Sequence, residues 1–142
     1  MNQYVLGFIY STAEDVVLLQ KSANRMFPIR WNGIVGHIEE GEEPNHAMIR
    51  ESMEEIGFSF FTDWKHKITY ICPGGIVYIF VAKFESQLFV PELKDKTEKQ
   101  PIQWFKLNDI PEDCNKNIRW MIPLCNEPLL HPAIIHATTL GI

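Results

Sequence analysis

The stretch that decides the fold reads GHIEEGEEPNHAMIRESMEEIGF and spans Gly36–Phe58. Pro44 suits the first turn of a helix, because its φ is already close to the helical value and its missing N–H leaves nothing unsatisfied there. Gly57 suits the left-handed position that commonly ends a helix. We therefore expect Pro44 to open a helix that continues through Asn45–Ile56 and ends at Gly57.

One face of this expected helix is acidic. At about 100° per residue, Glu51, Glu54 and Glu55 fall within roughly 100° of arc. Like charges at these spacings destabilise a helix by roughly 0.2–0.5 kcal/mol each, so we expect a cation on this face. Clustered carboxylates favour Mg²⁺ or Mn²⁺ over softer metals. The opposite, apolar side is expected to hold Ile49, Met53 and Ile56.

Arg50 stands beside these acids in the sequence. On a helical wheel it points about 100° away from Glu51. We therefore expect its guanidinium to reach sideways, either to Glu42 or to backbone carbonyls of the loop before the helix. The acidic face would then remain for the metal.

The spacing of these residues resembles the Nudix signature. Five residues separate Gly36 from Glu42, and seven separate Glu42 from Arg50-Glu51. Two residues then precede Glu54-Glu55, and one residue precedes Gly57. The one departure is Ser52, where the family usually has an aliphatic residue. Because Ser52 lies on a flank between the two faces of the wheel, we expect slightly looser packing there and little effect on the chemistry.

The resemblance implies a fold and a metal site. The fold would be α+β, a Nudix-type α/β/α sandwich with a mixed central sheet. Arg50 would hold the loop and orient Glu51, and the general base would be Glu51 or Glu98, a choice that the sequence leaves open. The alternative for Glu98 is a solvated acid in a charged loop. The metal ligands that the resemblance implies are the Gly36 carbonyl and the carboxylates of Glu51, Glu54, Glu55 and Glu98.

Trp31-Asn32-Gly33, just before the signature, is similar to the MutT-type branch, which hydrolyses nucleoside triphosphates, including oxidised purine ones. In that branch the residue matching Asn32 reads the edge of the base, as a carboxamide can with its adjacent donor and acceptor. The alternative is structural, with Trp31 in the core and Asn32 forming a turn. The expected substrate contacts are Lys21, Phe27, Trp31, Asn32, Asn117 and Trp120. A solvent-facing Lys21 and a core Trp120 remain open alternatives.

Composition sets the remaining limits. The 142 residues, 46% hydrophobic and 22% charged, indicate one globular domain over 1–142. The net charge of −5 disfavours binding to nucleic acid polymers or acidic membranes. The three cysteines show no metal-binding spacing, and the N-terminal residues show no signal peptide, so we expect a cytoplasmic protein. Monomer and homodimer both remain open.

Patterns elsewhere predict the other elements. Tyr4–Tyr10 and Val16–Lys21 should form a hairpin. Ile76–Phe84 is too apolar for one-sided exposure and should be central in the sheet. Asn117–Leu124 has apolar residues at helical spacing. Further strands are expected at Ile34–Val35, Phe58–Thr62, Lys65–Tyr70 and Trp104–Leu107. A surface loop is expected at Leu88–Lys99. The tail from His131 has no pattern that predicts a helix or strand.

Together these features predict Mg²⁺-dependent hydrolysis of a nucleoside triphosphate, such as 8-oxo-dGTP, to the monophosphate and pyrophosphate. Mn²⁺ is a possible substitute. The nearest alternative keeps the chemistry and changes the substrate to ADP-ribose or a dinucleoside polyphosphate. A more distant alternative is a non-catalytic nucleotide-binding module.

Overall fold

The computed structural model describes residues 2–22, 30–56, 63–84, 102–128 and 132–138. The strands expected at Phe58–Thr62 and the loop at Leu88–Lys99 lie outside these residues. The elements are β1 (Gln3–Ser11), β2 (Val16–Ser22), β3 (Arg30–Asn32), β4 (Ile34–His37), α1 (Pro44–Ile56), β5 (Lys65–Cys72), β6 (Gly75–Phe84), β7 (Ile102–Lys106), α2 (Ile118–Cys125) and β8 (Ala133–His136).

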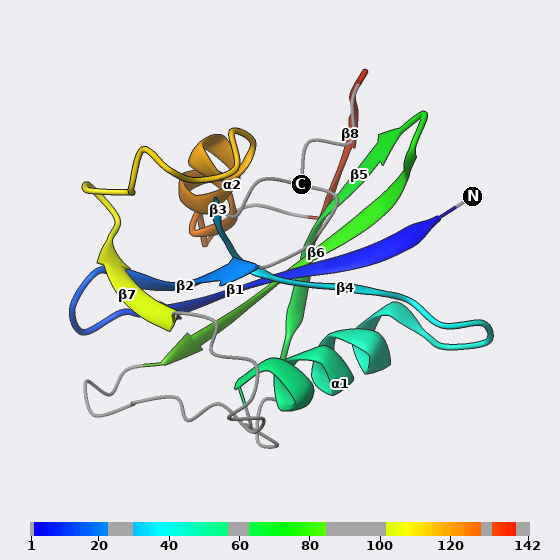
Figure 1. Cartoon of the computed structure of the whole chain (residues 1–142), viewed down its shortest axis with the longest axis horizontal. Helices are drawn as coiled ribbons and strands as arrows, with labels where there is room; N and C mark the ends of the chain where they lie inside the picture. Colours follow the sequence, from blue (N-terminus) through cyan, green and yellow to red (C-terminus); the bar gives the residue numbers. More distant parts are fainter. Residues whose placement is uncertain (1, 23–29, 57–62, 85–101, 129–131, 139–142) are drawn as a thin grey trace.

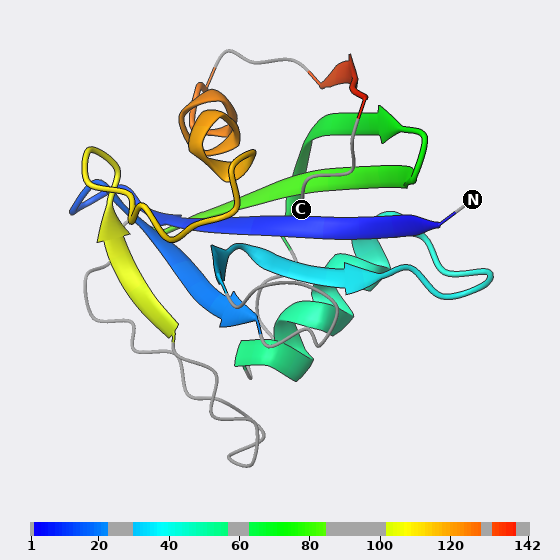
Figure 2. The same cartoon turned by 45° about the horizontal axis from the view of Figure 1, so that its top comes forward.

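The strands form one mixed sheet between two helices. Its order is β3-β2-β1-β6-β5-β8, with β4 added to β1 and β7 added to β2. The β1–β6 and β5–β8 pairs are parallel, whereas the β1–β2 hairpin is antiparallel. Helix α1 covers one face and α2 the other (Figures 1 and 2). The predicted α/β/α sandwich with a mixed central sheet is therefore confirmed.

Strand β6 lies centrally, as its sequence predicts. It pairs with β1 on one side and β5 on the other. Val77, Ile79 and Val81 belong to the core under α2, and Phe80 and Ala82 belong to the core under α1. Alternate residues of a strand point to opposite faces, so a continuous apolar run is what a strand covered on both faces requires.

Helix α2 closes the second core. Ile118, Met121 and Ile122 are buried against the sheet. The buried hydroxyl of Tyr10 on β1 donates a 2.7 Å hydrogen bond to the carbonyl of Ile122. Burial raises the pKa of Tyr10 well above its ordinary value, so the phenol remains a donor at any physiological pH.

Two strands were not expected from the sequence. Strand β3 is only three residues long, and β8 falls in the tail for which the sequence made no prediction. Strand β8 pairs in parallel with β5, in a register that sets Tyr70 beside Ile135. Short edge strands form because a neighbouring strand offers backbone partners, which no local sequence pattern reveals.

The buried cysteines Cys72, Cys114 and Cys125 are free thiols. Burial raises the pKa of Cys125 to about 12, which keeps its thiol protonated. Neither helix in the described part of the chain has the length and apolarity needed to cross a bilayer.

Helix α1 packs closely on β1 because Gly7 lacks a side chain. A Cβ at Gly7 would lie 2.6 Å from Met48 Cε and 2.9 Å from the Trp64 ring. We expect Gly7→Ala to lower the free energy of unfolding by about 1–3 kcal/mol through overpacking. In a Met48→Ala background, which has its own cost of about 2–5 kcal/mol, the same change should cost less. Urea unfolding of the single and double variants measures this coupling, and strict additivity would contradict the proposed contact.

Candidate active site

The Arg50 guanidinium joins α1 to the loop that precedes it. Its Nε and Nη2 donate to the two carboxylate oxygens of Glu42, at 2.8 and 2.9 Å. Nη2 also donates to the His37 carbonyl at 2.8 Å, as expected for a side chain reaching back to the loop. The bidentate pairing fixes the guanidinium plane, which a single ion pair would not do.

Arg50 also contacts the acidic face of α1, which the sequence analysis did not expect. Nη1 donates to Glu51 Oε1 at 2.8 Å and lies 3.4 Å from Glu54 Oε2. The prediction that Arg50 points away from Glu51 is wrong at the level of its terminal atoms. The long side chain bends, so the direction of the Cα–Cβ bond does not fix where the guanidinium lies.

Glu51 is almost completely buried, with 8% of its surface exposed. Its carboxylate lies directly against the Cα of Gly36 on β4, where a Cβ would collide with the carboxyl carbon and Oε1. Gly36 therefore leaves the space that this carboxylate occupies. The sequence analysis assigned Gly36 a role through its carbonyl and did not foresee this packing role.

The faces of α1 differ from the expected ones. The buried residues are Ala47, Met48, Glu51, Ser52 and Ile56. Of the residues expected on the apolar side, Ile56 is buried and Ile49 is partly buried against the core under α1, whereas Met53 is only partly buried. Ser52 is completely buried, and its hydroxyl donates to the Ile49 carbonyl at 2.8 Å. The buried face of α1 therefore combines small residues with the larger Met48, for which Gly7 of β1 leaves room.

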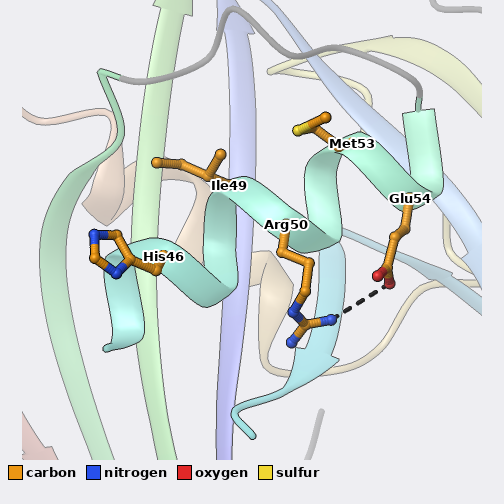
Figure 3. Close-up of a pocket in the computed structure, with 5 residues that line it drawn as sticks. All are labelled: His46, Ile49, Arg50, Met53 and Glu54. Carbon is orange, nitrogen blue, oxygen red and sulfur yellow. Dashed lines mark hydrogen bonds and ion pairs between the residues drawn. The ribbon is translucent and has the colours of Figure 1, made fainter. Parts of the chain in front are cut away.

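Ile49 and Met53 also line a hollow on the outer side of α1. This hollow has a volume of about 350 Å³ and is also lined by His46, Arg50 and Glu54. Figure 3 shows the five side chains along the helix, with the Arg50–Glu54 ion pair at one end. Glu54 is thus exposed beside the site, with 58% of its side chain accessible.

The two best-placed carboxylates have opposite pKa shifts. Hydrogen bonds from Arg50 lower the pKa of Glu42 below its ordinary value near 4.5. Burial raises the pKa of Glu51 above the same value, although Arg50 acts against this rise. Burial therefore destabilises the ionised form of Glu51, and the interaction with Arg50 offsets only part of this effect.

The donor chemistry of this site fits a divalent cation. Buried and exposed carboxylate oxygens lie around Arg50, and an added positive charge would offset the desolvation of Glu51. Among the described residues, no three His, Cys, Asp or Glu side chains are gathered as a metal site. Glu55 is half-buried on the same helix. The metal ligands inferred from the sequence, Gly36, Glu51, Glu54 and Glu55, remain a prediction.

The residues expected to bind substrate lie on two faces of the sheet. Lys21 pairs with Trp31 across β2 and β3, and its Nζ lies 5.4 Å from the centre of the Trp31 ring. Lys21 Nζ also lies 3.3 Å from Asp113 Oδ2, a partner that the sequence gave no reason to select. Trp31 is partly buried and packs edge-on against Phe105 beside the core under α2. Its role in substrate binding stays a prediction.

Asn32 has the opposite orientation from Trp31, because adjacent residues on a strand point to opposite faces. It is 8% exposed, and its Oδ1 accepts a hydrogen bond from the Gly33 N–H at 2.8 Å. Asn32 therefore points toward the α1 side of the sheet, where Glu51 lies, whereas Lys21 and Trp31 lie on the α2 side.

Asn117 and Trp120 are brought together at the start of α2. The Trp120 indole N–H donates to Asn117 Oδ1 at 3.0 Å, and Asn117 Nδ2 lies 3.4 Å from the Tyr70 hydroxyl. The Tyr70 and Trp120 rings are 6.2 Å apart. These polar groups and rings form one cluster on the α2 side. The candidates Phe27 and Glu98 lie outside the described residues.

The opposite pKa shifts predict opposite effects of pH on stability. A raised pKa means that Glu51 contributes stability below pH 4.5 that is lost as the pH rises through its folded-state value. Glu42, with a lowered pKa, contributes stability above pH 4.5 that is lost in acid as the pH falls through its folded-state value. Urea unfolding in EDTA, from about pH 3 to pH 8, measures both dependences.

We expect Glu51→Gln to match or exceed the wild-type free energy of unfolding at neutral pH, since it removes a buried charge. Glu42→Gln should destabilise the protein at neutral pH, because it removes the charge that pairs with Arg50, and its deficit should shrink in acid. If the two variants had the same sign of effect at neutral pH, the assigned environments would be wrong.

Comparison with known proteins places this geometry in a family. The NUDIX domain family model matches residues 2–125. The m7GpppN-mRNA hydrolase dcap-2 of Caenorhabditis elegans is 32% identical over 106 residues, covering 70% of this chain and 13% of that protein. The oxidized purine nucleoside triphosphate hydrolase of Mus musculus is 33% identical over 96 residues, covering 58% of this chain and 53% of that protein.

Among solved structures, a MutT protein from Bacillus halodurans superposes with a TM-score of 0.72 at 18% identity, covering 100% of this chain and 94% of that one. At that identity the likeness concerns the fold alone. The chain spans only 13% and 53% of the lengths of the two curated relatives. The match over residues 2–125 shows that this chain belongs to the NUDIX domain family.

Proposed function

We propose that this protein is a Nudix pyrophosphohydrolase that cleaves a nucleoside triphosphate to the monophosphate and pyrophosphate with Mg²⁺, and that Mn²⁺ can substitute. The observation that carries the proposal is the buried Glu51 carboxylate, which lies against Gly36 and is held by Arg50 within a signature whose charged and glycine positions are all present. A desolvated carboxylate with a raised pKa is typical of catalytic sites, which supports an enzyme over a non-catalytic module.

The chain's own residues supply positioning and a base. Arg50 holds Glu51 and, through Glu42 and the His37 carbonyl, fixes the loop beside it. A bound divalent ion would offset the charge of the phosphate oxygens and acidify a water molecule. As water attacks phosphorus and the phosphoanhydride P–O bond breaks, a carboxylate accepts the water proton. Glu51 and Glu98 are the candidates for this base.

The raised pKa of Glu51 suits the role of base, because a carboxylate of higher proton affinity takes a proton more readily from water. The ligands proposed for the ion are Glu51, Glu54, Glu55, Glu98 and the Gly36 carbonyl. Their oxygen-only chemistry suits Mg²⁺, and Nudix hydrolases generally use a divalent metal.

Two relatives favour different substrates. The mouse relative acts on oxidized purine nucleoside triphosphates, which supports an 8-oxo-dGTP-like substrate for this chain. The nematode relative acts on capped mRNA, which supports a second candidate, a nucleoside diphosphate linked to another group. ADP-ribose and dinucleoside polyphosphates belong to this second class. All of these substrates contain the same type of scissile bond.

A substrate panel with Mg²⁺ tests the proposal. We expect turnover of at least one member among 8-oxo-dGTP, the four ordinary dNTPs, ADP-ribose, a dinucleoside polyphosphate and a capped RNA oligonucleotide. The measurement is release of nucleotide products by chromatography. Glu51→Gln and Glu54→Gln should each reduce kcat by about 10²–10⁴-fold. Near-normal turnover in both variants would refute the site assignment.

The Arg50→Lys variant distinguishes the role of Arg50 in positioning Glu51 from the effect of its positive charge. Lysine retains the positive charge but cannot make the bidentate pair with Glu42 and also reach Glu51 and the His37 carbonyl. We expect kcat to fall while KM changes little, because the arginine does not touch substrate in this proposal. Lys83→Arg, on an exposed part of β6, serves as the matched control for a change of cation type. An unchanged kcat in Arg50→Lys would remove Arg50 from the mechanism.

A further inference from the structure

Gln20 is a buried polar residue for which the proposed chemistry has given no role. It lies on β2, where its neighbours Leu18 and Leu19 are core residues, and only 3% of its surface is exposed. In the sheet register it stands between Asn32 of β3 and Ile102 of β7. Its side-chain oxygen, Oε1, has no hydrogen-bond partner among the described residues.

A buried acceptor without a hydrogen-bond donor lowers the stability of the folded protein. Leaving a buried carbonyl oxygen without a donor destabilises a protein by about 1–3 kcal/mol, and most buried polar atoms are therefore satisfied. Methionine or leucine would fill the same space in β2 without that cost. A donor from outside the described residues, such as an N–H on a bound ligand, would remove this cost.

The orientation of Gln20 directs this acceptor toward the α1 side of the sheet. Leu18, two residues earlier on the strand, packs in the core beneath α1, as does the cross-strand neighbour Ile102. Residues two apart on a strand share a face, and so do directly paired residues. Gln20 and Asn32 therefore lie side by side on the face that also carries Glu51.

The distance along the chain fits an extended nucleotide. Asn32, Ile34 and Gly36 alternate along β3 and β4, and Gly36 contacts the Glu51 carboxylate. Four residues of extended chain span about 13 Å, so the polar pair lies about that far from the site of the phosphate chemistry. This separation is comparable with the distance between the scissile phosphates and the base edge of a nucleotide.

Gln20 and its neighbour Asn32 differ in the hydrogen bonding of their side-chain oxygens. Asn32 Oδ1 already accepts the Gly33 N–H at 2.8 Å, whereas Gln20 Oε1 has no donor in the part of the chain that the structure describes. We propose that Gln20 Oε1 accepts a hydrogen bond from an N–H on the nucleobase of the substrate, and that Gln20 thereby helps set base preference. This inference rests on the proposed function, since it requires a nucleotide whose phosphates lie near Glu51.

The test replaces the amide by a thioether of similar length. We expect Gln20→Met to raise KM for the preferred nucleotide by about three- to tenfold with kcat nearly unchanged, because one hydrogen bond to a buried acceptor is lost. The ratios of kcat/KM among bases in the panel should move toward one. Thermal stability should hold or increase, since an unsatisfied buried group is removed.

Gln103→Met is the matched control. Gln103 lies on the adjoining strand β7, is exposed, and pairs with Leu19, so it faces away from Gln20. It should leave KM, base preference and stability unchanged. Gln20→Leu provides a second apolar variant should Gln20→Met fold poorly.

The outcomes separate this inference from the proposed function. If the wild type hydrolyses nucleotides and Gln20→Met retains the wild-type KM and base ratios, Gln20 has only a structural role and the inference fails alone. If the wild type hydrolyses none of the panel, the proposed function fails, and equilibrium binding of the same nucleotides to both proteins decides the role of Gln20. Equal affinities, or a loss of stability with no change in affinity, would overturn it.

Discussion

The site depends on one guanidinium shared among several acceptors. Arg50 binds Glu42 through two hydrogen bonds, the His37 carbonyl through a third and Glu51 through a fourth. These partners belong to β4, the following loop and α1, so a single side chain fixes the geometry between strand and helix. The pKa of Arg50 is raised far above its ordinary value by these carboxylates, so its charge is permanent. Removing Arg50 would leave the Glu42 and Glu51 carboxylates without the cation that pairs with them.

The same arrangement explains why a carboxylate can be buried at the centre of the site. Desolvation opposes the ionised form of Glu51, and Arg50 offsets only part of this cost. Gly36 provides the space for the carboxylate, since any side chain at that position would occupy it. A site held in this way gives up stability for reactivity, because the protein maintains an incompletely compensated charge where phosphate chemistry is proposed.

The sheet divides the remaining candidates between two environments. Trp31 and Lys21 lie on the α2 side, as does the Asn117–Trp120 pair, whereas Asn32 and Gln20 lie on the α1 side with Glu51. Residues that are neighbours in sequence therefore cannot all meet one ligand through the same face. Because successive side chains on a strand point to opposite faces, Trp31 and Asn32 face opposite sides of the sheet although they are adjacent in sequence.

The sequence alone determined the helix Pro44–Ile56, the hairpin, the central position of β6 and the family signature, because periodicity, turn residues and spacing are local properties. Only the tertiary structure decided which face of α1 is buried, with Ser52 completely buried and Met53 half-buried, since this depends on how the helix packs on β1, where Gly7 makes room for Met48. It also decided that the Arg50 guanidinium reaches Glu51 and that Gln20 Oε1 has no hydrogen-bond donor among the described residues. Both outcomes depend on side-chain conformation and packing, which no local pattern records.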